Sequence, residues 1–487
     1  MSGTLAIADL MSVSGVSFGT SGARGLAAAM TDQVCYAYTA AFLQHLAAQG
    51  EIRHGSRVAL AGDLRPSTPR ILAACAAAIE DGGYAAVNCG AIPTPAVANW
   101  AMREGIASLM VTGSHIPDDR NGIKFYRPGG EILKADEAAI RARSVDLPGA
   151  RFTSDGVLLH PALPVASPVA YRAYVRRYVD FFPAGCLARR RVAVYEHSTV
   201  AREALAAILG ALGAQVVPLG RTERFVPVDT EAIRAEDVAL ARRWADEIGF
   251  DAIVSADGDG DRPLVGDERG DWLRGDVAGV LTARYLGADQ VVTPVSSNTV
   301  LERSGWFAGT LRTRIGSPFV IAGMQQARGR CVVGYEANGG FLTQSDVVRD
   351  GRRLPALPTR DAVIVALAVL GLAAETGVPV SKLSALLPPR FTASDRLKDF
   401  PTALAQQRIA DLSSGGAAAI QTALPGLGAV REIDETDGLR VGFAGGDIVH
   451  LRPSGNAPEL RCYVEADSET GAAALLRRCL AELERWR

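Results

Sequence analysis

Up to residue 375, short apolar runs alternate with stretches in which apolar residues recur at helical spacing. The runs at residues 57–61, 191–195 and 290–295 are typical of buried strands, and residues 69–81 are typical of a helix. Strands that alternate with helices form right-handed βαβ units around a mostly parallel sheet. This part of the chain is therefore predicted to form α/β domains, the last of them closed by a long helix at residues 360–375.

The remaining residues show a different pattern. Helices are predicted at residues 402–412 and 469–486, and short strands at residues 438–443, 447–451 and 459–465. Runs of strands between helices are typical of an α+β domain.

The number of domains follows from the length and from these changes of pattern. A chain of 487 residues is too long for a single core, and a Pro-rich stretch at residues 160–168 is typical of a linker. We predict three tandem α/β domains with mixed, mostly parallel sheets and a C-terminal α+β domain, arranged around one central cleft. They are placed at residues 1–160, 161–270, 271–385 and 386–487.

Three polar loops, each after a predicted strand, are the first candidates for a functional site. They contain Ser114, Asp257 and Glu336. In open α/β sheets the ligand lies beyond the carboxyl ends of the strands. We therefore expect the three loops to face one another, with a loop of the last domain at residues 452–458 as a lid over the cleft.

The loop Asp-Gly-Asp-Gly-Asp-Arg at residues 257–262 has the clearest chemistry. Its three aspartates can turn toward one point, where two carboxylates about 4 Å apart would repel by about 4 kcal/mol without a cation. Oxygen ligands without His or Cys favour a hard ion such as Mg²⁺. A solvated acidic turn is the alternative. A Ca²⁺-binding EF-hand is disfavoured because no glutamate closes the loop where that motif requires one.

Ser114 follows another predicted strand, at residues 106–111. Gly113 permits a sharp turn and Pro117 ends it, so that the Ser114 hydroxyl would point away from the sheet. A strand that restarts at residues 122–126 would bring Lys124 back beside this hydroxyl. For this loop alone, an ordinary β-turn is the alternative.

Composition narrows the class of protein. Hydrophobic residues make up 48% and the net charge is −2, so neither a nucleic acid nor an acidic membrane surface is implied as a partner. The seven scattered cysteines, without a Cys-x-x-Cys pair, favour a reducing compartment. No signal peptide is visible at residues 1–15, and the longest apolar run, residues 362–374, is too short to span a bilayer. We expect a soluble, cytoplasmic protein of unspecified oligomeric state.

Five motifs occur in a characteristic order. They are Phe-Gly-Thr-Ser-Gly-Ala-Arg-Gly (18–25), Thr-Gly-Ser-His-Ile-Pro (112–117), the aspartate loop (257–262), Gly-Tyr-Glu-Ala-Asn-Gly (334–339) and Arg-Pro-Ser-Gly-Asn-Ala-Pro (452–458). In this order they resemble the motifs of the α-D-phosphohexomutases, and the chain is similar to the phosphomannomutase branch of that superfamily. The resemblance implies four domains that carry a serine loop, a metal loop, a sugar loop and a phosphate loop.

The resemblance also implies a role for Ser114 and the aspartates. Ser114 would be carried as a phosphoserine, and one of its phosphate oxygens would complete a Mg²⁺ site. The other ligands of that site would be Asp257, Asp259 and Asp261. Phosphoryl transfer depends mostly on positioning and on neutralising charge. Besides Mg²⁺, the charge would be neutralised by Arg24, Lys124 and Arg262.

Substrate binding is implied for the other two loops. Glu336 and Asn338 would face sugar hydroxyls. The phosphate that is not reacting would be held by Arg452, Ser454, Gly455 and Asn456. The sugar loop departs from the common pattern Gly-Glu-Met-Ser-Gly-His, since Asn338 replaces the serine and Gly340 the histidine. These changes leave the nucleophile and the metal loop intact, but they bear on sugar specificity and remove one candidate proton carrier.

Two residues remain as candidates for acid–base work. His115 could act as an acid or base, or it could be a loop histidine bonded to the backbone. Lys124 is the better general base if burial lowers its pKa.

The implied reaction interconverts hexose 6-phosphate and hexose 1-phosphate through a bound hexose 1,6-bisphosphate that reorients, with mannose phosphate as the expected substrate. Phosphoglucomutase or phosphoglucosamine mutase activity is the alternative within the superfamily. A non-catalytic sugar-phosphate sensor is disfavoured because a pure binder does not need both a nucleophile and three aspartates. A metal-dependent phosphatase is disfavoured because the phosphate loop would grip the end opposite the chemistry.

Overall fold

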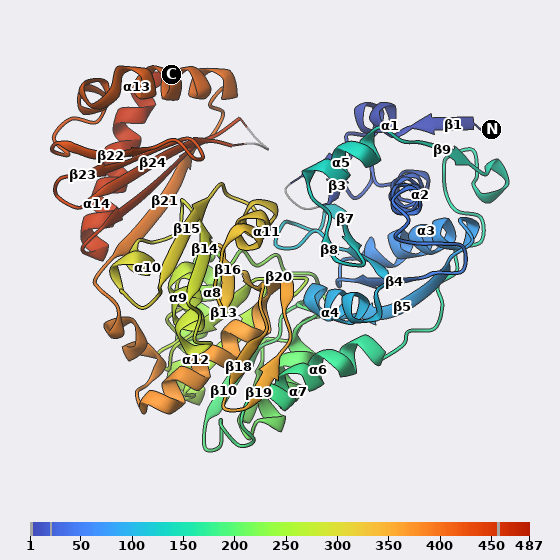
Figure 1. Cartoon of the computed structure of the whole chain (residues 1–487), viewed down its shortest axis with the longest axis horizontal. Helices are drawn as coiled ribbons and strands as arrows, with labels where there is room; N and C mark the ends of the chain where they lie inside the picture. The colour runs from blue at the N-terminus through green and yellow to red at the C-terminus, as the bar shows by residue number, and fades with distance from the viewer. Residues whose placement is uncertain (1–2, 20–21, 455–457) are drawn as a thin grey trace.

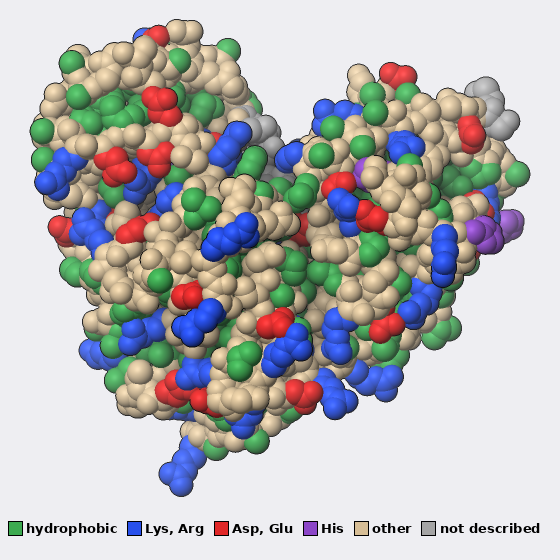
Figure 2. Space-filling model, in the orientation of Figure 1, with side chains coloured by type: hydrophobic (Ala, Val, Ile, Leu, Met, Phe, Trp, Pro, Cys, Tyr) green, Lys and Arg blue, Asp and Glu red, His purple; other side chains and the backbone are tan. Residues whose placement is uncertain are grey.

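The computed structural model describes residues 3–19, 22–454 and 458–487 (Figure 1). Four units follow one another along the chain, each built on its own sheet. The first and the fourth form the two arms of a heart-shaped outline, and the second and third form its base. Figure 2 shows the notch between the two arms. The predicted fold of three α/β units and a C-terminal α+β unit is confirmed, whereas the predicted boundaries between them stay predictions.

The first sheet has the strand order β2–β3–β7–β6–β4–β5, with β8 beside β7. β4 is parallel to β5 and β6, and β7 is antiparallel to β6 and β3. The strands are β2 (Ser17–Phe18), β3 (Ala23–Leu26), β4 (Arg57–Gly62), β5 (Ala85–Ala91), β6 (Ala107–Val111), β7 (Arg120–Arg127) and β8 (Gly130–Glu131). The helices are α1 (Ile7–Ser14), α2 (Asp32–Ala48), α3 (Thr68–Asp81), α4 (Thr94–Glu104) and α5 (Lys134–Arg141). A small separate sheet pairs β1 (Gly3–Ala6) with β9 (Ser144–Leu147).

The second and third sheets repeat one plan. A parallel core of three strands is extended by antiparallel strands at one edge, in the orders β11–β10–β12–β13 and β15–β14–β16–β17–β20. The second unit contains α6 (Val169–Phe181), β10 (Arg191–Tyr195), α7 (Arg202–Ala211), β11 (Gln215–Leu219), α8 (Ala235–Ile248), β12 (Ala252–Ala256) and β13 (Pro263–Gly266). The third contains α9 (Gly275–Tyr285), β14 (Gln290–Pro294), α10 (Val300–Arg303), β15 (Gly309–Thr313), α11 (Ser317–Gln326), β16 (Val332–Tyr335), β17 (Phe341–Thr343), the hairpin β18 (Val347–Arg349) and β19 (Arg352–Leu354), β20 (Leu357–Asp361) and α12 (Ala362–Thr376).

The fourth unit is an antiparallel sheet in the order β21–β25–β24–β23–β22, flanked by two helices. Its elements are β21 (Phe391–Leu397), α13 (Thr402–Ala423), β22 (Val430–Asp434), β23 (Leu439–Phe443), β24 (Ile448–Pro453), β25 (Leu460–Ala466) and α14 (Glu469–Leu483). Its hydrophobic core is separate, whereas one large core joins the second and third units with part of the first.

Two predicted elements need correction. The long helix α12 begins at Ala362 and not at residue 360, because the Asp361 carboxylate accepts a hydrogen bond from the N–H of Val363 and caps the helix. The helix α13 runs on to Ala423 through a kink at Gly416, where the sequence predicted an end at residue 412.

Helix α12 is apolar on all sides, and its residues from Ala362 to Ala373 are buried. Among the described residues, no single helix is long and apolar enough to cross a membrane. α12 and the following 3-10 turn (Val380–Leu386) meet that criterion only as a pair bent by 82°.

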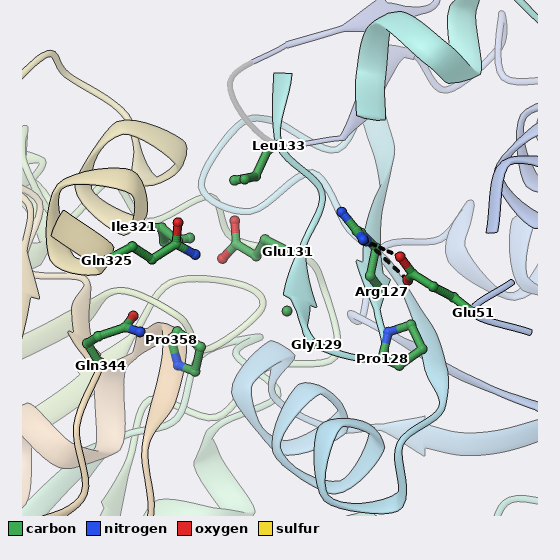
Figure 3. A pocket seen from close by; sticks show the side chains of 11 residues that line it. Glu51, Arg127, Pro128, Gly129, Glu131, Leu133, Ile321, Gln325, Gln344 and Pro358 are labelled. Atoms are coloured by element: carbon green, nitrogen blue, oxygen red, sulfur yellow. Dashed lines mark hydrogen bonds and ion pairs between the residues drawn. The ribbon is translucent and has the colours of Figure 1, made fainter. Parts of the chain in front are cut away.

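The first and third units touch around Glu131 of β8. Its carboxylate accepts hydrogen bonds from the hydroxyls of Thr359 (2.6 Å) and Ser317 (3.2 Å). Figure 3 shows Glu131 pointing toward the third unit, with Gln325 and Gln344 across the gap. These bonds fix the third sheet against the first.

Candidate functional site

Residues of all four units line one cavity of about 490 Å³. Residues predicted from the sequence line it from all four sides: Arg24, His115, Arg262, Glu336, Asn338, Arg452 and Ser454. The remaining predicted residues that the structure describes adjoin this lining and are buried: Ser114, Lys124, Asp257, Asp259 and Asp261. Gly455 and Asn456 lie outside the described residues. The loops that the sequence singled out therefore converge on a single cavity.

Ser114 lies in the loop after β6, fully buried and in the left-handed region at φ 58°. Such a conformation costs a non-glycine residue about 1–3 kcal/mol, so the surroundings must impose it. The Ser114 N–H donates to the Thr112 hydroxyl at 2.7 Å. The Ser114 hydroxyl donates to Asp257 Oδ2 at 2.5 Å, which aims it at the metal loop.

Arg65, which the sequence analysis did not single out, holds this loop in place. Its guanidinium is fully buried and donates to four carbonyl oxygens of the loop, those of Ser114 (2.8 Å), Ile116 (2.6 Å), Pro117 (2.7 Å) and Arg120 (3.1 Å). Asp63 accepts from Arg65 Nε at 2.9 Å and from the hydroxyl of Thr112 at 2.8 Å. In the sequence, the only sign of this role was that Arg65 stands two residues after Asp63, at the end of a predicted strand.

The three aspartates of the metal loop lie together between β12 and β13, with one carboxylate oxygen of each within 4.8 Å of the others. Asp257 Oδ1 accepts the N–H groups of Asp261 and Arg262, at 3.2 and 3.1 Å. Gly258 permits the close approach of the serine loop, because a Cβ there would lie 2.8 Å from the Ser114 carbonyl oxygen.

A cation fits the loop because two buried oxygens, Asp259 Oδ1 and Asp261 Oδ1, have no hydrogen-bond partner. Burial, and then the charges of Asp259 and Asp261, raise the pKa of Asp257 well above its ordinary value. A bound divalent ion would remove this electrostatic cost and would give the two free oxygens a partner. The all-oxygen donor set suits Mg²⁺.

Lys124 lies on β7 opposite Met110 of β6. Its buried ammonium donates to Asp259 Oδ2 and to Asp261 Oδ2, each at 2.5 Å. In this arrangement Lys124 is the counter-ion of the metal loop. Its predicted role as a general base stays a prediction.

His115 follows the serine and lies between it and two arginines. Its Nδ1 accepts from Arg262 Nη1 at 2.9 Å and lies 3.4 Å from the Ser114 hydroxyl. Burial, followed by the charges of Arg262 and Arg24, lowers the pKa of His115 to about 2. The imidazole is therefore neutral, and so low a pKa makes it a weak base in this arrangement.

The cationic wall contains Arg24 of β3, Arg262 and Arg360. Burial, and then the charges of Arg262 and Arg360, lowers the pKa of Arg24 to about 10, so that it stays charged at neutral pH. Arg360 is a further residue that the sequence analysis missed, because it was placed in a helix and lies instead on β20.

The sugar and phosphate loops complete the cavity. Asn338 Oδ1 accepts the N–H of Gly340 at 2.9 Å, and the Asn338 carbonyl accepts the hydroxyl of Thr230 at 2.7 Å. Arg452 Nε lies 3.0 Å from Asp437 Oδ2, and the Ser454 N–H donates to the Glu459 carbonyl at 2.8 Å. The cavity therefore offers both hydrogen-bond acceptors and cations, and these come from several of the four units.

Four family models match the chain in succession. They describe phosphoglucomutase/phosphomannomutase α/β/α domain I at residues 15–146, domain II at 171–270, domain III at 274–391 and the C-terminal domain at 404–482.

Relatives match over nearly the full length. A phosphomannomutase from Sinorhizobium fredii is 44% identical over 476 residues, which cover 96% of this chain and 99% of the relative. One from Salmonella muenchen is 42% identical over 484 residues, 98% of this chain and 97% of the relative. A solved structure from Thermus thermophilus, described as a phosphomannomutase, shares the fold with a TM-score of 0.76 at 21% identity and covers 96% of this chain and 99% of its own. The chain thus belongs to the phosphoglucomutase/phosphomannomutase family, and it is an enzyme of the phosphohexomutase kind.

Proposed function

We propose that this enzyme interconverts hexose 6-phosphate and hexose 1-phosphate, chiefly of mannose, and that Ser114 carries the phosphoryl group between them. The observation that supports this most is the position of the Ser114 hydroxyl. It is held 2.5 Å from Asp257 by a strained loop, next to a cavity whose walls carry arginines. A strained, buried serine among a candidate metal site and fixed cations suits covalent phosphoryl transfer.

Mg²⁺ would be held by Asp257, Asp259 and Asp261 together with an oxygen on Ser114. When bound, it would neutralise charge at the transferring phosphoryl group. The chain's own residues have the other tasks. Lys124 would hold Asp259 and Asp261 in place, and Arg24 and Arg262 would bind phosphoryl oxygens.

The proposed cycle has two balanced transfers. In the first, a sugar hydroxyl oxygen bonds to the phosphorus of phosphoserine, the bond from Ser114 Oγ to phosphorus breaks, and the hydroxyl proton leaves to a base. His115 and Lys124 are the candidate bases, and either would need its present contacts to change when substrate binds, because the lowered pKa of His115 makes it a weak base and Lys124 donates to two carboxylates. The bound hexose 1,6-bisphosphate then reorients, and its second phosphate returns to Ser114 Oγ in the reverse of these steps.

The phosphate that is not reacting would be held by Arg452 and Ser454, with Gly455 and Asn456 of the same loop. The cavity has to retain the bisphosphate while it turns, and residues from all four units line it. Exclusion of water while the intermediate turns would prevent its hydrolysis.

Mannose phosphate is proposed as the main substrate because the two relatives at 44% and 42% identity are phosphomannomutases. Mannose and glucose differ only at C2. A site with no buried partner dedicated to that hydroxyl discriminates by about 1–3 kcal/mol. We therefore expect glucose phosphate to be a second, slower substrate.

The test is turnover of mannose 1-phosphate, glucose 1-phosphate and glucosamine 1-phosphate on one preparation, with Mg²⁺ and a trace of bisphosphate. We expect the highest kcat/KM for mannose 1-phosphate, and a value for glucose 1-phosphate lower by about tenfold to a hundredfold. Absence of turnover with all three substrates would overturn the proposed function.

A further inference from the structure

Arg360 joins two loops of the site. Its guanidinium Nε donates to Asp261 Oδ2 at 3.1 Å and its Nη2 lies 2.8 Å from the same oxygen, while Nη1 donates to Glu336 Oε2 at 3.2 Å. The side chain is only 2% exposed, yet it lines the central cavity. One cation therefore pairs with a carboxylate of the metal loop and with the acceptor of the sugar loop.

Gly340 makes this position of Arg360 possible. A Cβ at Gly340 would lie 2.6 Å from Cδ and 2.8 Å from Cγ of Arg360, closer than real Cβ atoms approach another atom. The φ angle of Gly340 is not positive, so its backbone conformation does not require glycine. The residue matters here because it has no side chain and so leaves room for Arg360. The residue pair Gly340 and Arg360 is thus one device, in which a small residue on the sugar loop admits a long cation from β20.

The ion pair of Arg360 with Glu336 changes the electrostatic environment of a bound sugar. Glu336 is already paired with a cation. It can still accept hydrogen bonds from hydroxyls, but its negative charge is largely compensated and attracts an ammonium group only weakly. Arg24 and Arg262 stand in the same cavity. Among the described residues that line it, six arginines face four carboxylates: Arg24, Arg262, Arg360, Arg396, Arg452 and Arg461 against Asp229, Glu231, Glu336 and Asp395.

We propose that Arg360 is a specificity-determining residue, which makes the site select hexose phosphates over 2-amino sugar phosphates. It does so by holding Glu336 in an ion pair, so that Glu336 is not free to serve as the counter-ion of a substrate ammonium group. An ammonium group at C2 would add a positive charge to a lining in which the described arginines outnumber the carboxylates, whereas a hydroxyl would not. A repulsive element of this kind rejects one substrate without tightening the binding of the other.

This inference rests on the proposed function, and the experiment separates the two. For wild type, Arg360→Gln and Arg360→Lys, kcat/KM is measured with glucose 6-phosphate and with glucosamine 6-phosphate, which differ in one group at C2. Competitive inhibition constants replace kcat/KM where turnover is too slow. 2-Deoxyglucose 6-phosphate shows what loss of the C2 hydroxyl does without a charge.

Arg360→Gln removes the charge and is expected to reduce the discrimination against glucosamine 6-phosphate, relative to 2-deoxyglucose 6-phosphate, by about tenfold. Arg360→Lys keeps the charge and should retain most of the discrimination. A merely structural role would lower kcat/KM for all three sugars in proportion and leave their ratios unchanged. Unchanged ratios in Arg360→Gln would therefore overturn the inference.

A second measurement needs no variant. In the wild type, the same ratio should shrink as the pH rises from about 6.5 to about 9, because the substrate amine loses its proton over that range. A ratio that stays constant over this range would contradict the inference even if Arg360→Gln does not fold. If glucose and mannose phosphates are not turned over at all, the proposed function itself fails. If they are turned over and the ratios do not move, only the role of Arg360 is wrong.

Discussion

At the scale of single residues, most polar atoms of the site have fixed hydrogen-bond partners, and a few buried ones have no such partner. Asp259 Oδ2 accepts from Thr94 and Lys124, and Asp261 Oδ2 from Lys124 and Arg360. Their Oδ1 atoms are buried and have no hydrogen-bond partner among the described residues. Thr94, Lys124 and Arg360 thus orient Asp259 and Asp261 and leave one oxygen of each for the proposed metal ion.

Asp259→Asn should therefore weaken Mg²⁺ binding by about tenfold or more, since a charged oxygen ligand becomes neutral at a hard-ion site. The change is measured by titration calorimetry, and activity should be partly recovered at higher Mg²⁺. Asp229→Asn is the matched control. It replaces an aspartate of the same cavity whose Oδ1 accepts the N–H groups of Glu231 and Ala232. Equal losses in the two variants would show that the metal does not bind where we place it.

A second prediction at the scale of single residues concerns His450 and the pH dependence of stability. Its ring donates to the Asp437 carbonyl at 2.6 Å, while Nδ1 is buried without a partner. Burial, with a further contribution from Arg440, lowers the pKa of His450 to about 4. An unfolded histidine titrates near about 6.5, so between these values the unfolded state binds more protons and stability falls as the pH falls.

From about pH 7 to about pH 5, His450 should cost about 2 kcal/mol of unfolding free energy. Urea unfolding at the two pH values measures the loss, which should be smaller by about that amount in His450→Gln. His115 and His197, whose pKa values are also lowered, contribute to the pH dependence in the same direction. An identical loss in His450→Gln and wild type would refute the assignment.

At the scale of elements, the loop between β6 and β7 depends on an arginine from the connection between β4 and α3. Arg65 satisfies four of its carbonyl groups, and each buried carbonyl left unpaired costs about 1–3 kcal/mol. Lysine carries the same charge but cannot present a guanidinium fork.

Arg65→Lys should therefore lower kcat by about a hundredfold or more and raise hydrogen exchange in residues 113–120, while the rest of the first sheet stays protected. Arg70→Lys on α3 is the matched control, since Arg70 bonds Asp32 and the carbonyl oxygens of Ala27 and Met30 instead. Exchange that rises equally in both variants would mean that Arg65 has no special hold on the serine loop.

The elements that could be predicted from the sequence are those with a one-sided or continuous apolar pattern. The strands before the serine, metal and sugar loops are short apolar runs between glycine-containing loops. The first of them was predicted at residues 106–111 and spans Ala107–Val111. Helix α2 was not predicted, because it is buried on nearly all sides and shows no amphipathic stripe. The end of α13 was misplaced because Ser-Ser-Gly-Gly at residues 413–416 looks like a helix stop.

The site residues can likewise be divided into those that could be predicted from the local sequence and those that could not. Side chains in glycine-containing loops after strands, such as Ser114 and the aspartates, could be found from local pattern. Arg65 and Arg360 could not, because their roles depend on partners far away in sequence: Arg65 on the serine loop and Arg360 on Asp261 and Glu336. Buried arginines of this kind are identified only when the fold brings the partners together.

At the scale of the whole molecule, the fourth unit has its own core and faces the other three across the cavity. It is tied to the third unit through Glu465, which accepts from Thr299 and from Arg390, and through Asp437, which accepts the N–H of Ile315. Arg452 is its cation nearest to Asp437, at 3.0 Å. The proposed grip on the distal phosphate would thus come from a unit that has a core of its own and is joined to the third unit by these bonds.

Arg452→Ala should raise KM for sugar phosphates and let bisphosphate escape between the two transfers, because a charge-assisted contact with the distal phosphate is lost. Steady-state rates with and without added bisphosphate measure both effects. Arg431→Ala, on an exposed position of β22, should change neither. An unaltered KM together with no dependence on added bisphosphate would remove Arg452 from the site.

The central claim is that Ser114 carries the phosphoryl group, and rapid-quench mass spectrometry of the enzyme tests it most directly. After incubation with hexose 1,6-bisphosphate, the account predicts one phosphate on Ser114. That phosphate should disappear within a single turnover when hexose 6-phosphate is added, with an equal amount of bisphosphate formed. Ser114→Ala should neither take up phosphate nor turn over substrate, with its fold retained. Turnover in the absence of phosphate on Ser114, or with phosphate on another residue, would contradict the account.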